Sequence, residues 1–176
     1  MANREALREL QTRLATRLQA ARTEGASVAW LAVLSGGRRY LLPLGQSGEI
    51  FPVANLQPVP YSRKWFRGVL NIRGGLHGVV DMADFIAQSG GPQRGQPALT
   101  DVSVVTLNPA LEVNCALQVD TLAGLRGVDA FASSAPASAD VPAYFGNRFV
   151  DKDGESWQEI NLRLLAQTPQ FLSISA

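Results

Sequence analysis

The sequence predicts a mainly β protein that begins with one helix. Near the N-terminus, leucines recur three and four positions apart, which is the spacing of one helix face. From Ser27 onward, apolar and polar residues alternate in short runs that Gly, Pro, Asn and Asp separate, as in β-strands. The two halves of this second region also resemble each other, which indicates a duplicated unit.

Residues 1–26 form the predicted helical segment, with an amphipathic helix over residues 3–22. Its apolar stripe is narrow and consists of Leu7, Leu10, Leu14 and Leu18. Five arginines on the remaining faces indicate a solvated side. A helix with so narrow an apolar stripe needs an apolar partner, because most helix stability comes from tertiary packing. We expect the body of the same domain to supply that partner, and another helix is the alternative.

Nine short runs with the alternation of strands follow the helix. They cover residues 28–35, 40–44, 68–72, 76–82, 102–107, 111–119, 121–125, 144–150 and 156–161. Gly36-Gly37 between the first two runs is a strong hairpin signal. The Gly- and Pro-rich residues 89–97 and the Ala-, Ser- and Pro-rich residues 132–142 are expected to be loops.

The duplication is clearest around two aromatic pairs. Trp65-Phe66 precede a strand, a hairpin turn at Gly74-Gly75 and a return strand that ends at Asp81. Tyr144-Phe145 precede the same succession, which ends at Asn161. Repetition of the aromatic pair indicates that it belongs to the core.

Each duplicated unit has about five short strands, and units of this size close most easily as small barrels that remove exposed sheet edges. We therefore expect residues 27–176 to form one domain of two five-stranded β-barrel subdomains with a shared core. Their approximate limits are residues 27–90 and 98–176, and exchange of segments between them is left open.

Composition excludes several classes of protein. The chain has 176 residues, of which 46% are hydrophobic and 18% charged. Its longest apolar run, residues 28–34, is far shorter than the roughly 20 residues that span a bilayer. The N-terminal segment lacks the apolar centre of a secretory signal. We expect a cytoplasmic protein without direct membrane insertion.

The net charge of +1 conceals an uneven distribution. Residues 1–73 carry 11 basic and 4 acidic side chains, whereas residues 74–176 carry 5 basic and 11 acidic ones. Two faces of opposite charge would steer differently charged partners or favour self-association. Interleaving of the two halves in space, which would cancel this asymmetry, is an equally good interpretation.

The residues that enzymes need are scarce. The single histidine, His77, and Asp81 lie on one strand face about 13 Å apart, too far for a hydrogen-bonded pair. The single cysteine, Cys115, forms no disulfide within the chain and is expected to be a half-buried strand residue. Nucleotide-binding and nucleophile motifs are missing from the sequence. We predict no catalysis, no cofactor and no metal site.

A basic and aromatic run covers residues 63–67 and reads RKWFR. Basic side chains contact phosphates and aromatic ones stack on bases, so residues 63–73 suggest a nucleic-acid-binding β-barrel as the alternative function. The sequence pI of about 7.9 and the repetition of Trp65-Phe66 in the second half argue against this interpretation.

The stretch over residues 58–81, PVPYSRKWFRGVLNIRGGLHGVVD, carries a family resemblance. Its prolines, its GVLNIRG hairpin and its VVD strand resemble the signature of the CheW-like domain, the adaptor of bacterial chemosensory arrays. The resemblance extends over residues 27–175 and implies two five-stranded β-barrels. The N-terminal helix and the YSRKWFRGVLNIRG form are most similar to CheW-like proteins of type IV pilus systems, which implies control of twitching motility.

The resemblance also implies a set of partner-binding residues. Asn71, Arg73 and Gly74 match the hairpin signature, in which the arginine is implicated in receptor contact and kinase control. Glu49 falls where the family has an acid beside the receptor-binding groove, and Ser47 stands where an apolar residue is common. Two residues of the second half, Val119 and Asp120, match the strand that lines this groove.

From the bare sequence, Arg73 is equally well interpreted as a solvated turn residue. The resemblance favours a functional role and implies two partners. These are the regulatory domain of a CheA-type histidine kinase and the cytoplasmic tip of a methyl-accepting chemoreceptor. An apolar groove between the barrels would hold receptor helices, with Glu49 and Arg73 as charges on its rim.

Overall fold

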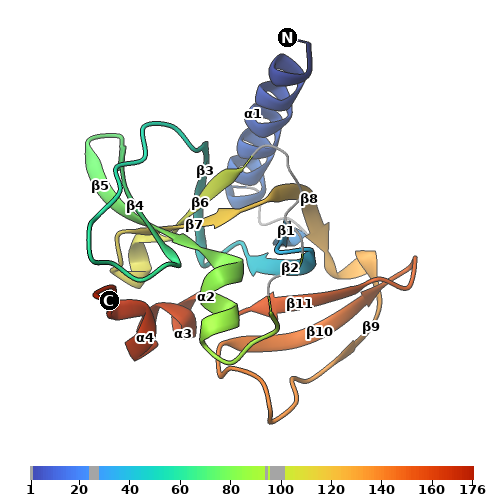
Figure 1. Cartoon of the computed structure of the whole chain (residues 1–176). Helices are drawn as coiled ribbons and strands as arrows, with labels where there is room; N and C mark the ends of the chain where they lie inside the picture. Colours follow the sequence, from blue (N-terminus) through green and yellow to red (C-terminus); the bar gives the residue numbers. More distant parts are fainter. Residues whose placement is uncertain (1, 24–27, 94, 96–101) are drawn as a thin grey trace.

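The computed structural model describes residues 2–23, 28–93, 95 and 102–176. Two β-sheets form the body, and a long N-terminal helix stands beside them (Figure 1). The helices are α1 (Ala2–Thr23), α2 (Met82–Gln88), α3 (Leu162–Gln167) and α4 (Pro169–Leu172). Two short 3₁₀ segments occur at Pro109–Leu111 and Val128–Ala130.

Sheet A has six strands in the order β8-β1-β2-β11-β10-β9. Their bounds are β8 Thr121–Gly127, β1 Val28–Ser35, β2 Arg38–Pro43, β11 Ser156–Ile160, β10 Phe145–Asp151 and β9 Phe131–Ala135. Sheet B has five strands in the order β3-β6-β7-β5-β4. Their bounds are β3 Ser47–Pro52, β6 Ser103–Leu107, β7 Cys115–Val119, β5 Gly75–Asp81 and β4 Phe66–Ile72.

The two sheets exchange strands between the halves of the chain. In sheet A, the β1–β2 hairpin of the first half pairs with β8 and β11 of the second half. In sheet B, the β6–β7 hairpin of the second half pairs with β3 and β5 of the first half. In each sheet, one of the two pairings between the halves of the chain is parallel. In sheet A it is β2 with β11, where Tyr40 is opposite Gln158, and in sheet B it is β5 with β7, where Val79 is opposite Ala116. The sheets therefore do not coincide with residues 27–90 and 98–176.

The predicted class is confirmed: the protein is mainly β, with two packed sheets and an N-terminal helix. One sheet has six strands rather than five, because β9 extends it beyond β10. Among the strands that the structure describes, neither sheet closes into a complete barrel, since β8 and β9 are the edge strands of sheet A while β3 and β4 are those of sheet B.

Alternation along the strands produces three apolar clusters. Neighbouring residues of β1 point to opposite faces, so Leu31 joins the largest cluster while Trp30 joins a smaller one. The largest cluster contains side chains from both sheets and from all four helices. The smaller clusters belong to sheet A, around Trp30 and Trp157, and to sheet B, around Leu70 and Val79.

The duplication is visible in matched backbone contacts. The Asp81 amide donates to the Trp65 carbonyl at 2.7 Å, and the Asn161 amide donates to the Tyr144 carbonyl at 2.7 Å. The side chains of Asp81 and Asn161 then cap α2 and α3 respectively. Each return strand thus ends in a short capped helix, where the sequence pattern predicts only a strand.

Other differences from the predicted elements have local causes. The run over residues 111–119 becomes a strand only at Cys115, because a 3₁₀ turn precedes it and Glu112 adopts a left-handed conformation at φ 58°. Strands β3 and β9 have no counterpart among the predicted runs, and most of β9 falls within the stretch expected to be a loop. Parts of residues 1–26 and 89–97 lie outside the described residues.

Helix α1 docks on its own domain through the C-terminal part of the leucine stripe. Leu14 and Leu18 are 6% and 2% exposed and join the largest cluster. Gln11 Nε2 also donates to Ser103 Oγ at 2.8 Å. Leu10 is 48% exposed, and the N-terminal part of the helix extends away from the sheets (Figure 1). The helix packs against β3 and β8, which each end one of the two sheets.

Candidate functional site

Arg73 lies in the tight turn between β4 and β5. Ile72 pairs with Gly75, so Arg73 and Gly74 are the two turn residues, with φ of 50° and 81°. Positive φ at both positions is the type I′ geometry that suits the twist of a hairpin. Asn71 Oδ1 accepts a hydrogen bond from the Gly74 amide at 3.0 Å and closes the turn. The expected turn at Gly74-Gly75 is thus shifted by one residue, and Arg73 itself occupies it.

The head of Arg73 makes a two-pronged ion pair with Glu49 of β3. Arg73 Nη2 is 2.8 Å from Glu49 Oε2, and Nη1 donates to Oε1 at 2.9 Å. The side chain of Arg73 remains 72% exposed and that of Glu49 37% exposed. The guanidinium also lies 5.9 Å from the centre of the Phe51 ring. The structure therefore brings together two residues that are 24 positions apart in sequence.

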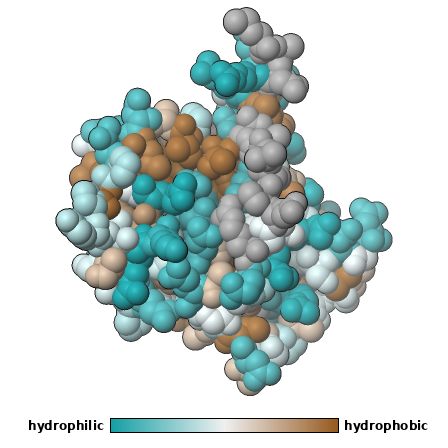
Figure 2. Space-filling model, in the orientation of Figure 1, coloured by the Kyte–Doolittle hydropathy of each residue, from teal (hydrophilic) through white to brown (hydrophobic). Residues whose placement is uncertain are grey.

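A cleft of about 780 Å³ lies between α1 and β3, and Arg73 and Glu49 line it. We refer to it as the α1 cleft. Its lining consists of Arg8, Gln11, Thr12, Ala15, Thr16, Leu18, Glu49, Ile50, Phe51, Pro52 and Arg73. In Figure 2, hydrophobic surface gathers beside α1, over the region where Figure 1 places β3 and the chain that leaves it. The cleft thus combines an apolar floor with charged residues at its edge.

A second cavity adjoins the first around the hairpin, and we refer to it as the hairpin hollow. It has a volume of about 490 Å³ and is lined by Phe51, Pro52, Ala54, Asn55, Gln57, Val69, Leu70, Asn71, Ile72, Arg73 and Leu76. Phe51, Pro52 and Arg73 line both cavities. Leu76 is 62% exposed, so the hollow offers apolar surface to a partner.

Three of the residues expected to bind a partner are buried instead. Ser47 is 0% exposed, and its Oγ donates to the Pro43 carbonyl at 2.8 Å. Val119 is also fully buried, at the end of β7, where it pairs with Ser103 of β6. Asp120 is 3% exposed, and its Oδ2 accepts from the Gly36 amide at 2.7 Å. These residues hold the hairpins and strands in place and line neither cavity.

The apolar groove expected between the two barrels is partly covered. Helix α1 packs against both β3 and β8, so it bridges an edge strand of sheet B and an edge strand of sheet A. Its Leu14 and Leu18 contribute to the core there. The open part that remains beside Arg73 and Glu49 is the α1 cleft.

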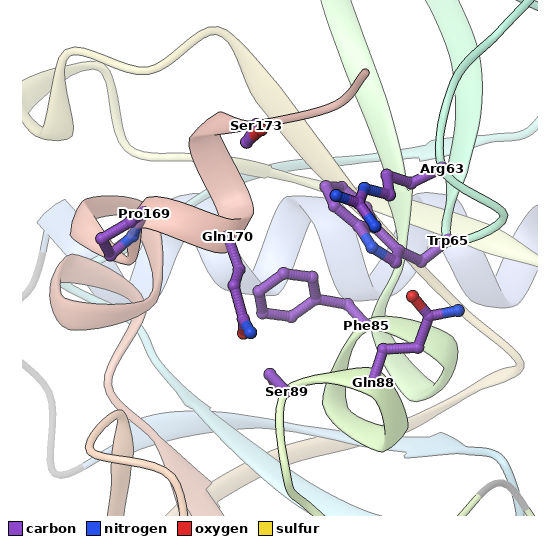
Figure 3. Close-up of a pocket in the computed structure, with 8 residues that line it drawn as sticks. All are labelled: Arg63, Trp65, Phe85, Gln88, Ser89, Pro169, Gln170 and Ser173. Carbon is purple, nitrogen blue, oxygen red and sulfur yellow. The ribbon is translucent and has the colours of Figure 1, made fainter. Parts of the chain in front are cut away.

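A smaller pocket of about 290 Å³ lies between α2, α4 and the segment before β4 (Figure 3). Its lining is Arg63, Trp65, Phe85, Gln88, Ser89, Pro169, Gln170 and Ser173. Trp65 directly precedes β4 and Arg73 directly follows it, so the pocket and the hairpin tip are about 26 Å apart along the strand. No sequence motif marks this pocket, because its residues come from distant segments.

The basic and aromatic run does not form a base-stacking surface. Trp65 and Phe66 are 3% and 8% exposed, and both belong to the largest apolar cluster. Only the charged members of the run, Arg63, Lys64 and Arg67, are exposed. Because Trp65 and Phe66 are buried, their rings are not available to stack on bases, and this argues against nucleic-acid binding by the run.

The residues considered for catalysis are engaged elsewhere. His77 Nδ1 lies 3.2 Å from the Gly75 carbonyl oxygen, while Asp81 caps α2. Burial raises the pKa of the Cys115 thiol to about 12, which suppresses the reactive thiolate. Among the described residues, no group of three His, Cys, Asp or Glu side chains is placed to hold a metal ion. None of the described helices is long and apolar enough to cross a membrane.

Comparison with known proteins agrees with the fold. The sequence pattern of the CheW-like domain matches residues 29–170. Protein PilI of Pseudomonas aeruginosa is 27% identical over 165 residues, which cover 93% of this chain and 89% of that protein. The crystal structure of the scaffolding protein TtCheW from Thermoanaerobacter tengcongensis superposes with a TM-score of 0.58. That match has 16% identity and covers 81% of this chain and 94% of the other.

The match to the family pattern spans both sheets, including the hairpin that carries Arg73 and the strand-exchanged second half. The superposition independently supports the two-sheet architecture. The chain therefore belongs to the family of CheW-like domains, which are non-catalytic scaffolding domains of chemosensory signalling.

Proposed function

We propose that this chain is an adaptor that couples the cytoplasmic tip of a chemoreceptor to the regulatory domain of a CheA-type histidine kinase. Membership in the CheW-like family supports the adaptor class. The observation that carries the receptor-binding role is the exposed Arg73–Glu49 ion pair at the boundary of two adjoining cavities. A charged pair on the rim of an apolar cleft suits recognition of a helix by contact.

The predicted partner-binding residues divide into two roles in this proposal. Arg73 and Glu49 contact the partner, and Asn71 with Gly74 fixes the turn that presents the arginine. The buried Ser47, Val119 and Asp120 hold the surrounding strands and hairpins.

Coupling would proceed through the shared core. The hairpin and β3 both belong to sheet B, whose inner face packs against sheet A and α1. A shift of a receptor helix in the α1 cleft would therefore move the packed sheets and α1 together, and another surface of this unit would contact the kinase. Differential contact in two arrangements is what allows such a protein to bias a kinase equilibrium.

The similarity to Protein PilI supports a narrower proposal, that the output is type IV pilus twitching motility. A receptor-coupled adaptor would work in the cytoplasm, beside the membrane-bound receptor array. The opposite net charges of residues 1–73 and 74–176 also allow self-association within such an array.

Binding of a receptor-tip fragment and activation of the kinase test the proposal. Arg73→Glu should weaken fragment affinity by roughly tenfold, because a rim charge that attracted the partner now repels it. The unfolding midpoint should stay near that of the unaltered protein, since Arg73 is exposed in a turn.

Arg148→Glu is the matched control, because it reverses a charge at an exposed position of β10 that lines neither the α1 cleft nor the hairpin hollow. Its affinity should remain within about twofold of the unaltered protein, which is the size expected of a distant surface charge. Normal assembly and kinase activation by Arg73→Glu, or its unfolding, would show that the role given to Arg73 is wrong.

A further inference from the structure

We propose that α1 forms the second wall of the partner groove and that an acidic amphipathic helix of the receptor tip lies between α1 and β3. This inference rests on the proposed function, since it concerns the same groove. It adds a set of contact residues from the N-terminal helix, which faces Arg73 across the α1 cleft.

The cleft-lining residues of α1 form one continuous face. Arg8, Gln11, Thr12, Ala15 and Thr16 all line the α1 cleft. Their positions follow the i, i+3, i+4, i+7, i+8 pattern, so they project from the same side of the helix. This face is distinct from the one that directs Leu14 into the core. The side of α1 that docks on the domain and the side that borders the cleft therefore adjoin each other, and Gln11 and Leu18 belong to both.

Helix α1 is held in place while the cleft is open. Leu14 and Leu18 are nearly fully buried in the main core, and Gln11 donates to Ser103. Release of α1 would expose both leucines to water, which is unfavourable. The cleft already contains Arg73 and Glu49 with α1 docked, so a partner can reach them without displacing the helix. This favours α1 as a wall of the groove over α1 as a plug that the partner removes.

The side chains of the cleft indicate what the partner offers. On the α1 side, Ala15 and the two threonines, Thr12 and Thr16, are small enough to admit a helix closely. On the opposite side, Ile50 and Phe51 supply apolar contact.

The net charge of the α1 cleft indicates the charge of the partner helix. Glu49 uses both carboxylate oxygens on Arg73. Arg8 makes no ion pair within the part of the chain that the structure describes, which leaves the cleft with positive charge. An apolar helix with acidic residues along its edges complements this surface.

The test measures affinity for a soluble coiled-coil hairpin that contains the cytoplasmic tip of a chemoreceptor encoded in the same genome. Arg8→Glu should weaken binding by roughly tenfold, as expected when attraction becomes repulsion at a rim. Arg13→Glu is the control on the same helix, because Arg13 is exposed, pairs with Glu9 and does not line the cleft. It should change affinity by less than about twofold. Equal effects of the two substitutions would overturn the inference.

A second variant tests whether α1 is a wall of the groove or a plug that the partner displaces. The double substitution Leu14→Ala and Leu18→Ala loosens α1 from the core while leaving the sheets and the hairpin unchanged in sequence. If α1 is a wall, the loosened helix should reduce affinity for the receptor hairpin. Tighter binding would mean that the partner displaces α1, and the inference would be wrong.

Arg73→Glu in the same assay distinguishes failure of this inference from failure of the proposed function. Weaker binding by Arg73→Glu together with unchanged binding by Arg8→Glu overturns only the role of α1. Unchanged binding by Arg73→Glu removes the receptor site as a whole.

Discussion

The β4–β5 and β10–β11 hairpins occupy the same place in the two repeats but differ at their tips. Each hairpin follows a buried aromatic pair, and each ends in a residue that caps a short helix. The first turns through Arg73 and Gly74, whereas the second turns through the acidic segment over residues 151–155.

The acid of the second tip is engaged within its own turn. Asp151 Oδ1 accepts from the amides of Asp153 and Glu155, both at 2.9 Å, and Oδ2 accepts from Trp157 Nε1 at 2.9 Å. In the first tip, the small side chain of Asn71 closes the turn and the guanidinium of Arg73 points outward to Glu49. The two hairpins therefore share a buried base, and their tips make different contacts.

The largest expected effect tests whether the aromatic base is scaffold. Trp65→Ala should lower the free energy of unfolding by about 3–5 kcal/mol, because Trp65 is 3% exposed and packs on Phe85 and Phe171. Urea unfolding followed by circular dichroism measures the change. Lys64→Ala, at the exposed neighbouring position, should stay within about 0.5 kcal/mol. A small loss for Trp65→Ala would mean that the pair is not core.

A matched pair of glycines sharpens the comparison of the tips. Gly74 and Gly154 both have φ of 81°, and a methyl group at either position would meet no atom within 4 Å. Alanine at either should therefore cost a similar amount, about 1–2 kcal/mol, from backbone strain alone. Urea midpoints measure this cost.

The same two variants should differ in receptor binding. Gly74→Ala should also weaken affinity for the receptor hairpin, because it distorts the turn that presents Arg73. Gly154→Ala should leave that affinity unchanged. Equal losses of affinity for both variants would show that the first tip has no special role.

The pH dependence of stability should report on the second tip. Hydrogen bonds from Trp157 and from the Glu155 amide hold the pKa of Asp151 below its ordinary value. A depressed carboxyl pKa stabilises the fold above the unfolded-state pKa of about 3.9, and the benefit is lost as pH falls through the folded-state pKa.

Asp151→Asn should therefore lower the thermal midpoint at pH 7 and have a smaller effect near pH 3. Thermal unfolding of both proteins across this range provides the measurement. A deficit of constant size at every pH would contradict the ionised role of Asp151.

The fold is predictable to the extent that local pattern decides it. Alternation locates most strands, and repetition of the aromatic pair identifies Trp65 and Phe66 as core residues from the sequence alone. Strand β9 escapes prediction because its side chains are small and mostly exposed, and the helices α2 and α3 are too short for a helical period. The exchange of hairpins between sheets depends on pairing of distant segments, which no local pattern encodes.

The sequence predicts only the central residues of the candidate site. The family resemblance selects Arg73 and Glu49 as charges on the rim of a groove, and the structure adds that these two side chains contact each other beside the α1 cleft. The cleft-facing side of α1 has the pattern of an ordinary solvated face, because small polar residues and arginines at helical spacing are typical of solvent exposure. Its significance depends on where the helix docks, which is set by contacts with β3 and β8.

The smallest expected effect on stability is at the ion pair itself, and it separates binding from folding most clearly. Arg73 and Glu49 are 72% and 37% exposed, so solvent screens their attraction. A double-mutant cycle with Arg73→Ala and Glu49→Ala should give a coupling free energy for unfolding of at most about 0.5 kcal/mol. The same cycle measured on affinity for the receptor hairpin should give a larger coupling, because a bound partner excludes water from the pair. A coupling in unfolding that equals or exceeds the coupling in binding would make the pair a structural clasp between β3 and the hairpin, like the closed turn around Asp151.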